Sequence, residues 1–310
     1  MKLQLKKLSV LALTGAMVFT MGFGTFTAKV QAETAAAATD TTASTVPATG
    51  FRTENGKTYY YKDGVALTGW QKIDGNIYYF NAKDGGAALT GWNYLKSYSG
   101  GKTKYKYLFK KNGVLVTDLF SYKRSYIKSP MTIKVNLTTH NVTFYLYDSK
   151  KKAYIIPAKT VICSTARDGK STKVGHYRLE KTTARKWFIY KKSNPWHYYQ
   201  YGVHIKGCTS WFHSTMYRTT NKKSLIVDGS AGYNLLGTNQ TTTCIRLQAE
   251  NAKLIYDIST KTNKKARVWV DIYRSSNKGP FGKVTLKDTT GKLKSSQKYD
   301  PTDPSFAKKK

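Results

Sequence analysis

Acidic residues are scarce in this sequence of 310 residues. Asp and Glu together number 17 against 52 Lys and Arg, which gives a formal net charge of +35 at pH 7. A charge of this size exceeds what solubility requires, so it indicates a polyanionic partner. Nucleic acid is the default partner of so basic a chain, but the N-terminal sequence argues against it.

Cysteine is also scarce, with Cys163, Cys208 and Cys244 alone. In an exported protein an odd number predicts a free thiol and at most one disulfide. Cys163 and Cys208 can pair and leave Cys244 free, or both can be small buried hydrophobic residues. The five histidines lack close ligand spacing and acidic or cysteine partners, so we expect no metal site and no cofactor.

Runs rich in Ala, Leu, Glu and Lys are few outside the N-terminus. The chain instead holds 24 Tyr, 12 Phe and 24 Gly, with many Thr and Val, and this composition favours strands and turns over a helical bundle. The length suffices for two domains, one of them with a sizeable core. We therefore expect a mainly β protein.

A long apolar run lies near the N-terminus. Residues 1–32 are typical of a secretory signal peptide, with three lysines first, an apolar run over 8–26, and Val30-Gln31-Ala32 as a small-x-Ala cleavage site. Glycines and threonines weaken the run as a membrane span, so we expect only transient membrane contact, with an uncleaved anchor as the alternative. Cleavage after Ala32 removes four lysines and leaves a formal charge of +31. The exported protein would meet teichoic acids, anionic lipids and peptidoglycan as polyanions.

A repeat of about twenty residues follows a flexible spacer of Ala, Thr and Ser at 33–49. It covers 50–120 in two clear copies and a degenerate third, and copies end in Thr-Gly-Trp, as at Thr68-Gly69-Trp70. Pairs such as Asn55-Gly56 supply the positive-φ turns of short hairpins, and aromatic triplets supply the strands. We expect stacked hairpins in a solenoid.

These repeats resemble the choline-binding or cell-wall-binding repeats of Gram-positive surface proteins. In that family, aromatic rings of neighbouring repeats cage a quaternary ammonium, and the resemblance assigns Tyr60, Trp70, Tyr79 and Trp92 to such a cage. The wall ligand implied is choline-like or a teichoic acid. Alternatively, these rings only pack neighbouring hairpins together.

A second domain is expected over 130–274, after a basic bridge at 122–129. Alternation of apolar and polar residues predicts its strands, and the segment 249–258 predicts one short helix with a buried face. We expect 275–310 to be a basic tail, mostly solvated and mobile. The predicted strands are 132–137, 141–147, 157–163, 175–179, 186–190 and 266–270, and the helix face is Ala252, Leu254, Ile255 and Ile258.

Cys244 carries the most specific chemical signal. It follows Thr241-Thr242-Thr243 and precedes an apolar-Arg-apolar run, as expected for a thiol on a turn that enters a buried segment. Only the thiolate attacks carbonyls well, so the thiol needs a base. We choose His213, at the end of an apolar strand, and expect His204 to support it from the same strand.

The flanking residues resemble the L,D-transpeptidase catalytic domain, also called the YkuD fold. Its fold is a β-rich sandwich or barrel with a short helix after the catalytic cysteine. The matching segments are Cys163-Ser164-Thr165, Val174-Gly175-His176-Tyr177, Phe212-His213-Ser214 with Tyr217, Leu236-Gly237-Thr238, Cys244-Ile245-Arg246-Leu247 and 251–257.

This resemblance implies residue roles. Cys244 is the nucleophile, His213 is the general base, and Arg246 organises the turn or binds a stem carboxylate. Backbone N–H groups near Thr243 and Cys244 hold the oxyanion. The resemblance also implies substrate contacts from a further set of residues, namely Ser214, Tyr217, Thr241 and Thr242.

The implied reaction is acyl transfer between peptidoglycan stem peptides. The cysteine attacks the carbonyl between the third and fourth residues of a tetrapeptide, releases D-Ala, and passes the acyl group to an amine of a neighbouring stem. An exported, wall-associated protein of a Gram-positive-like bacterium fits this activity. Two alternatives remain, namely a wall-binding pseudoenzyme and an L,D-carboxypeptidase that uses water as acceptor.

The residues before the cysteine depart from the family pattern. The family has Ser-His-Gly there, and this chain has Thr241-Thr242-Thr243. Thr242 removes an imidazole beside the thiol. A glycine before a nucleophile often serves a positive φ or a close backbone approach, so we expect Thr243 to resist the turn that the family uses.

Overall fold

The computed structural model describes residues 49–192, 195–262 and 268–306. Contacts divide the chain after Thr45, so all described residues belong to one compact unit, 46–310. The predicted signal peptide at 1–32 lies outside the described residues, as does the spacer except for Thr49. Within the described ranges, no helix is long and apolar enough to cross a membrane. The chain is mainly β, as predicted.

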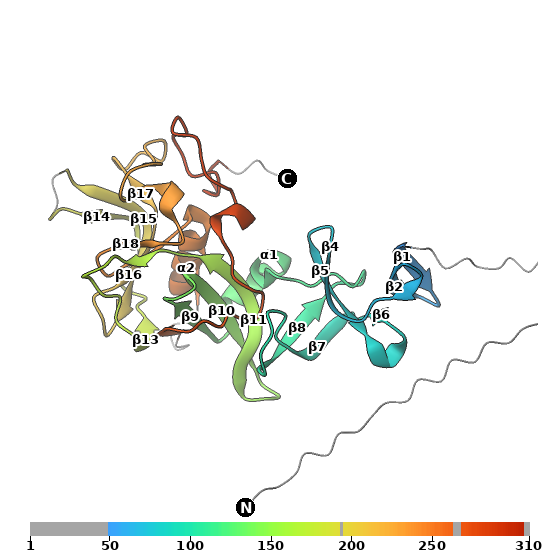
Figure 1. The fold of residues 1–310 in the computed structure, drawn as a ribbon. Helices are drawn as coiled ribbons and strands as arrows, with labels where there is room; N and C mark the ends of the chain where they lie inside the picture. Colours follow the sequence, from blue (N-terminus) through green and yellow to red (C-terminus); the bar gives the residue numbers. More distant parts are fainter. Residues whose placement is uncertain (1–48, 193–194, 263–267, 307–310) are drawn as a thin grey trace, which may run out of the picture. The chain divides into compact units, whose positions relative to one another are not determined.

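The N-terminal repeats form successive β-hairpins (Figure 1). The turns at Asn55-Gly56 and Asp74-Gly75 have positive φ at both residues, between 48° and 78°, as two-residue hairpin turns require. A short third strand closes each of the first two repeats. The strands are β1 (Thr49–Glu54), β2 (Lys57–Lys62), β3 (Val65–Ala66), β4 (Gly69–Ile73), β5 (Asn76–Asn81), β6 (Ala87–Ala88), β7 (Gly91–Lys96) and β8 (Lys104–Phe109).

Aromatic side chains pack the hairpins against one another. The Trp70 ring lies 5.2 Å from that of Tyr79 in its own hairpin and 5.1 Å from that of Tyr107 in the next. Its indole N–H donates to the Lys96 carbonyl at 3.1 Å. Tyr107 and Phe109 are fully buried, so the repeats share a small core of their own.

The C-terminal part of the unit is built on a ten-stranded mixed sheet, in the order β11-β10-β9-β20-β13-β15-β16-β19, with β14 and β17 also paired to β15. Apolar side chains of the sheet form the main core. A separate two-stranded ladder joins β12 and β18. The strands are β9 (Met131–Asn136), β10 (Asn141–Asp148), β11 (Ala153–Ile162), β12 (Thr165–Ala166), β13 (Gly175–Leu179), β14 (Arg185–Tyr190), β15 (His197–Lys206), β16 (Trp211–Ser214), β17 (Met216–Tyr217), β18 (Asn239–Thr241), β19 (Ile245–Leu247) and β20 (Val268–Tyr273).

One helix, α2 (Ala249–Lys261), follows β19 and packs on the sheet beside β15 and β16. The four residues predicted to face the core from this helix are all buried, which confirms the predicted apolar face. A four-residue helix, α1 (Leu119–Tyr122), capped by Asp118, was not predicted. The 3₁₀ turns are η1 (Ala82–Asp84), η2 (Arg124–Lys128), η3 (Tyr233–Leu235) and η4 (Leu286–Asp288).

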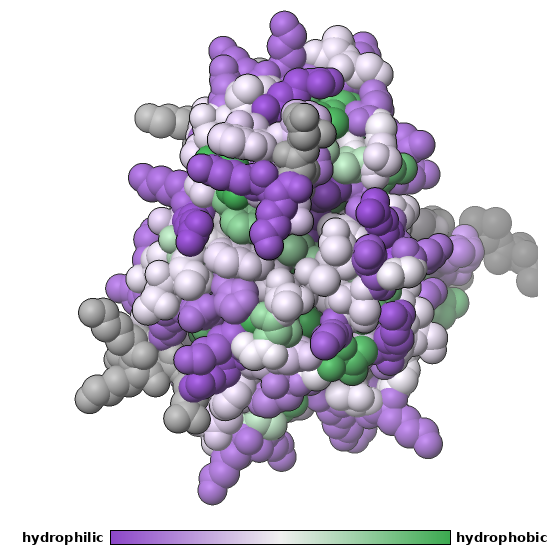
Figure 2. Space-filling view, turned by 90° about the vertical axis from the view of Figure 1, so that its left-hand side faces the viewer, coloured by the Kyte–Doolittle hydropathy of each residue, from purple (hydrophilic) through white to green (hydrophobic). Residues whose placement is uncertain are grey.

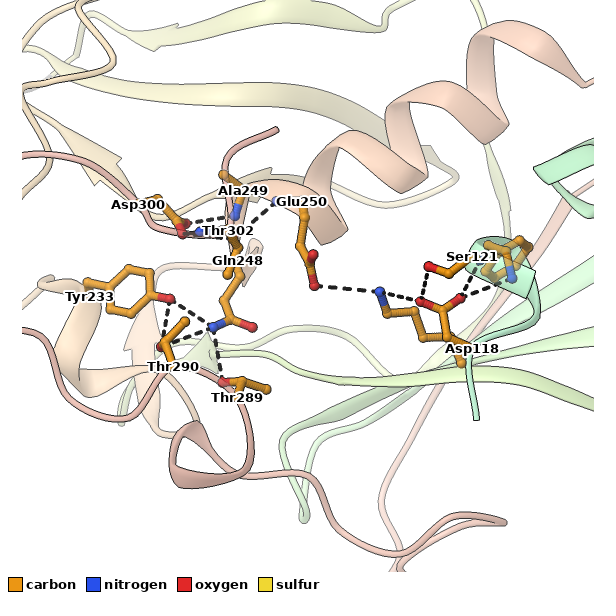
Figure 3. Close-up of polar contacts among 12 residues, drawn as sticks. Asp118, Ser121, Tyr233, Gln248, Ala249, Glu250, Thr289, Thr290, Asp300 and Thr302 are labelled. Atoms are coloured by element: carbon orange, nitrogen blue, oxygen red, sulfur yellow. Dashed lines mark hydrogen bonds and ion pairs between the residues drawn. The ribbon is translucent and has the colours of Figure 1, made fainter. Parts of the chain in front are cut away.

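The segment after β20 contradicts the expectation of a solvated, mobile tail. Residues 275–306 pack along the unit, and Asp300 and Asp303 are fully buried. Asp300 accepts from the Ala249 backbone N–H at 2.8 Å and Thr302 accepts from that of Glu250 at 3.3 Å (Figure 3). Gln248, the N-cap residue of α2, makes no side-chain capping bond, so these residues cap the helix in its place. The prediction was wrong because the segment is rich in lysine, and the few residues that become buried and anchor it do not stand out in such a sequence.

The same segment also contacts the third repeat. The Tyr107 hydroxyl donates to the Pro280 carbonyl at 2.9 Å, and the rings of Tyr107 and Phe281 lie 5.9 Å apart. On the sheet side, Tyr105 stacks on Tyr145 of β10 at 5.7 Å. The third repeat is therefore packed against both the sheet and the C-terminal segment.

Candidate active site

Strand alternation places the predicted reactive residues on one face. The strands β16 and β19 pair in parallel, with Phe212 opposite Ile245 and His213 opposite Arg246. Phe212 and Ile245 point into the core and have no exposed surface. Because successive side chains of a strand alternate, His213 and Arg246 point to the opposite face, where they line a cavity of about 560 Å³ together with Cys244.

Cys244 lies partly exposed at the edge of this cavity, just before β19. Burial raises the pKa of its thiol above the ordinary value, and a hydrogen bond from the Trp211 backbone and the charge of Arg246 oppose that rise. The Thr243 hydroxyl lies 3.9 Å from the sulfur. The resting sulfur is therefore a neutral thiol at pH 7, and it needs a base when it attacks.

His213 lines the same cavity as a neutral imidazole. Its Nδ1 lies 2.7 Å from the Ser214 carbonyl, and because a carbonyl only accepts, Nδ1 carries the proton. Nε2 is then the unprotonated nitrogen. Burial and, to a smaller extent, the charge of Arg246 lower the pKa of His213 to about 3, although the hydrogen bond to the Ser214 carbonyl opposes this shift. The Tyr199 ring packs 4.1 Å from the imidazole and holds its orientation.

The loop before the cysteine is held by hydroxyl groups. The Thr243 carbonyl accepts from Thr172 at 2.9 Å and from Ser210 at 2.8 Å. The Thr241 hydroxyl donates to the Cys244 carbonyl at 2.6 Å, across the turn. These bonds fix the peptide groups on both sides of Cys244, and with them the direction of its backbone N–H.

Thr243 does not adopt the backbone conformation that we expected it to resist. The described non-glycine residues with positive φ are six, and Thr243 is not among them. A β-branched residue therefore meets no left-handed strain at this position. All three threonines line the cavity, and Thr242, which replaces an imidazole of the family pattern, is exposed there.

Family models match both parts of the chain. Residues 130–272 match the L,D-transpeptidase catalytic domain of the YkuD family, and residues 48–92 and 67–120 match the choline-binding repeat. The segment that carries Cys244 is a YkuD domain. No curated protein matches the chain.

Solved structures that match part of the chain include three bacterial proteins. A fused Zn-dependent amidase/peptidase/peptidoglycan-binding protein from Clostridium acetobutylicum is 23% identical over 46% of this chain and 52% of its own, with a TM-score of 0.33. An L,D-transpeptidase from Mycobacterium tuberculosis is 16% identical over 46% and 57%, with a TM-score of 0.32. One from Stackebrandtia nassauensis is 17% identical over 48% and 59%, with a TM-score of 0.30. The chain thus spans little more than half the length of these proteins.

Two predicted substrate contacts lie away from the cavity of the YkuD domain. Ser214 and Tyr217 are fully buried and are not part of the cavity lining. The Ser214 hydroxyl donates to the Thr215 carbonyl at 2.7 Å and accepts from the Gln200 backbone N–H at 2.8 Å. The Gln200 side chain donates to the Tyr217 hydroxyl at 2.8 Å. Both hydroxyls are thus engaged inside the domain.

The prediction that His204 supports His213 from the same strand is wrong. It lies on β15, opposite Trp211, whereas His213 lies on β16. Its Nδ1 is 2.5 Å from Glu180 and its Nε2 is 2.9 Å from the Cys208 carbonyl. The error arose because β15, which is long, aromatic and interrupted by Gly202, was not recognised as a strand.

Residues of β15 that sequence reasoning missed complete the cavity. His197 and Tyr199 line it beside Cys244, and so does Gln240 of β18. Burial lowers the pKa of His197, and the charge of Arg246 adds to the effect. The enrichment of aromatic and β-branched residues at Tyr198, Tyr199, Tyr201 and Val203 was the signal available for this strand.

The three cysteines are free in the structure. The pairing of Cys163 with Cys208 that the sequence left open is not formed. Cys163 is fully buried in the main core, where burial raises the pKa of its thiol, and Cys208 is half-buried. Cys163 therefore fits the alternative of a small buried hydrophobic residue.

The four residues proposed as an aromatic cage do not form one cluster. Trp70 and Tyr79 are in ring contact, whereas Tyr60 contacts Phe51 at 4.8 Å. Trp92 is 39% exposed, with the Lys106 ammonium 5.6 Å from its ring. No ring contact among the described residues joins Trp92 to the other three, so packing accounts for Trp70 and Tyr79 and leaves Trp92 open to a ligand.

Proposed function

We propose that this protein is a peptidoglycan L,D-transpeptidase that forms cross-links between the third residues of two stem peptides. One observation carries the proposal: a thiol, a neutral imidazole and a guanidinium line a single cavity of a YkuD domain. The family supplies the reaction class, and the cavity supplies the groups which that reaction needs.

The chemistry begins from two neutral groups. As the sulfur of Cys244 attacks the stem carbonyl, Nε2 of His213 takes the thiol proton, and backbone N–H groups at Thr243 and Cys244 stabilise the oxyanion. The imidazolium so formed is a strong acid, because burial and Arg246 keep the pKa of His213 low. It gives its proton to the amine of the leaving D-Ala, and a thioester remains on Cys244.

The second half reverses these roles. The amine of a neighbouring stem attacks the thioester, passes a proton to Nε2 of His213, and expels the sulfur, which regains the proton as a thiol. Water in place of the amine would give hydrolysis. Transfer and hydrolysis therefore share every protein group named here and differ only in the acceptor.

The remaining features support the proposal that this activity is exerted at the cell wall. We propose that residues 1–32 direct export, that the repeats hold a choline-like or teichoic acid ligand of a Gram-positive-like wall, and that Trp92 contributes to that contact. The support is the choline-binding repeat match, the exposed Trp92 ring and the net charge of +35.

A defined stem substrate tests the proposal. The folded protein is incubated with a disaccharide tetrapeptide, and products are followed by mass spectrometry. We expect release of D-Ala together with a cross-linked dimer, and neither product from Cys244→Ala. Tripeptide without dimer would assign a carboxypeptidase instead. Absence of D-Ala release from folded protein would favour the wall-binding pseudoenzyme.

A further inference from the structure

One side of the catalytic cavity is formed by a long connection between two short strands. Residues 218–238, all of them described, join β17 to β18 and contain one 3₁₀ turn, η3, and no strand. Ser230 and Ala231 of this β17–β18 connection line the cavity together with Cys244. Connections longer than about 12–15 residues without regular structure are uncommon in compact domains and are often functional. Because no strand ladder holds Ser230 and Ala231, other contacts must set their position.

The C-terminal segment, residues 275–306, supplies such contacts. The side-chain nitrogen of Asn234 donates to the Leu293 carbonyl at 2.9 Å, and its side-chain oxygen accepts from the Leu293 N–H at 2.7 Å. The Tyr233 hydroxyl lies 3.0 Å from that of Thr290 (Figure 3). Two neighbouring residues of the β17–β18 connection are thus bonded to the C-terminal segment.

Apolar packing reinforces these hydrogen bonds. Val227 and Tyr233 are buried in a cluster with Leu286 of the C-terminal segment, and Leu293 packs against this cluster. The connection is also folded tightly on itself, since a Cβ on Gly232 would lie 2.4 Å from the Val227 carbonyl oxygen. Closely packed groups transmit displacements, so a shift at Tyr233 would also move the residues that line the cavity.

The cavity side of the connection contacts the strand that follows the reactive thiol. Nη1 of Arg246 donates to the Ala231 carbonyl at 2.9 Å, and Arg246 lies two residues after Cys244. A continuous set of contacts therefore runs from Leu293 through Asn234 and the connection to Arg246.

We propose that the C-terminal segment positions this side of the catalytic cavity, and that Asn234 is the positioning residue through which it acts. The segment begins after residue 272, where the match to the L,D-transpeptidase catalytic domain ends. The contact at Leu293 therefore comes from a part of the chain outside that domain. Its effect on turnover rests on the proposed function, whereas the position of the connection does not.

A general stabilising role of the segment is the alternative. The segment also caps α2 through Asp300, whose side chain bonds to Ala249 and Thr302, both outside the connection (Figure 3). A loss of stability alone leaves the cavity of the folded molecules unchanged, whereas a loss of positioning changes it. Asp300→Ala is therefore the matched control for Asn234→Ala, because each substitution removes one polar anchor of the same segment.

Hydrogen exchange, followed by mass spectrometry on the full chain, tests the contact directly. The N–H groups of residues 233 and 234 form hydrogen bonds within the connection. We expect Asn234→Ala to speed exchange in residues 227–236 about tenfold, because local opening is easier without the contact to Leu293, and to leave β9 unchanged. Asp300→Ala should speed exchange at the start of α2 and leave residues 227–236 as in the wild type.

Alkylation of Cys244 reports the shape of the cavity without turnover. Iodoacetamide and the bulkier iodoacetanilide react with the same thiolate, so the ratio of their rates does not depend on the thiol pKa. Peptide mass spectrometry quantifies labelling at this cysteine alone. A displaced connection should admit the larger reagent more readily, so Asn234→Ala should raise the ratio of iodoacetanilide to iodoacetamide rates about threefold. Asp300→Ala should leave the ratio at the wild-type value, and circular dichroism confirms that each variant is folded.

Two results overturn the proposal. One is wild-type exchange and a wild-type rate ratio in folded Asn234→Ala, and the other is an equal change of both readouts in Asp300→Ala. With a tetrapeptide substrate, Asn234→Ala should raise KM more than it lowers kcat, since the substitution alters a binding surface and no reacting group. A changed rate ratio in Asn234→Ala, together with a wild type that does not turn over the tetrapeptide, would retain the positioning role and reject the proposed function.

Discussion

At the residue scale, the protonation states of Cys244 and His213 depend on the residues that surround the two groups. Burial raises the pKa of the thiol and lowers that of the imidazole. Each group is thereby held in its uncharged form at pH 7. A preformed thiolate–imidazolium pair is disfavoured, so in the proposed reaction the proton moves as the sulfur forms its new bond.

This arrangement predicts the pH dependence of Cys244 alkylation by iodoacetamide. A raised thiol pKa lowers the thiolate fraction at neutral pH, so the rate should rise about tenfold per pH unit from pH 6 to beyond pH 9, with no plateau below the ordinary cysteine pKa of about 8.5. Arg246→Gln should shift the curve to higher pH, because the Arg246 charge lowers the pKa of the thiol. Stopped-flow labelling with Cys244→Ala as blank measures it. A plateau below pH 8 would indicate a preformed thiolate.

Some residues of the site could be predicted from the sequence, and others could not. Cys244, His213 and Arg246 were found because a reactive thiol needs a base and the flanking motif is specific. Thr243 was expected to strain the turn, yet the backbone there is not left-handed. The place of Gln240 in the cavity lining could not be foreseen, since it depends on the fold and not on the local sequence.

At the element scale, the C-terminal segment acts as a cap on α2. The helix begins with a glutamine that does not cap it, and Asp300 and Thr302 supply the missing acceptors from a segment about fifty residues further along the chain. Gln248 is engaged elsewhere, donating to the Tyr233 hydroxyl at 2.8 Å and to Thr289 at 3.1 Å (Figure 3). The start of α2 is therefore held by hydrogen bonds to residues 289–302.

Removing this cap should destabilise the whole unit. Asp300→Ala leaves the Ala249 N–H without its acceptor, and we expect a loss of about 1–2 kcal/mol in the free energy of unfolding by urea at pH 7. Asp288→Ala is the matched control, because Asp288 is exposed and caps only η4 within the segment. Equal effects of the two substitutions would show that the capping contact is not what matters.

The pH dependence of the same variant follows from the Asp300 carboxyl. Burial raises its pKa to about 6, against the ordinary 3.8, so the folded state binds an extra proton between about pH 4 and pH 6. The stability that this carboxyl contributes is fully present below pH 4 and falls as the pH rises to 6. The penalty of Asp300→Ala should accordingly be larger at pH 4 than at pH 7. A penalty that grows with pH would contradict this assignment.

Elements were predictable where the local pattern was strong. The strands β9, β10, β11, β13 and β14 and the face of α2 followed from alternation and helical spacing, whereas the two-residue strand β12 was not predicted. The strand β15 was missed because its kink at Tyr201, with φ of 54°, and Gly202 interrupt the period of two. Residues 275–306 pack against residues that are far away in the sequence. No local sequence pattern predicts such contacts.

At the scale of the whole molecule, the repeats and the YkuD domain are joined by specific contacts. Tyr105 stacks on Tyr145, Lys106 lies 3.5 Å from the buried Asp148, and Tyr107 bonds to Pro280. We expect residues 46–310 to unfold in one calorimetric transition, with equal calorimetric and van't Hoff enthalpies. Two separated transitions would show that these contacts couple the parts only weakly.

The surface of the molecule is hydrophilic and positively charged, which suits contact with anionic partners. Hydrophilic side chains cover most of the face in Figure 2, and hydrophobic ones appear there in small, separate patches. Because the formal charge is +35, we expect the proposed binding to wall polyanions to weaken as salt is added, since salt screens surface charges. The cavity at Cys244 carries the same sign of charge as the surface.

The proposed function requires Cys244 to be an acylatable nucleophile with Thr241-Thr242-Thr243 before it. The decisive measurement is intact mass after incubation of the folded protein with a carbapenem, which acylates such thiols. We predict one covalent adduct, present in Cys208→Ala and absent from Cys244→Ala and His213→Ala. No adduct on folded wild-type protein, or an adduct that persists in Cys244→Ala, would contradict the account.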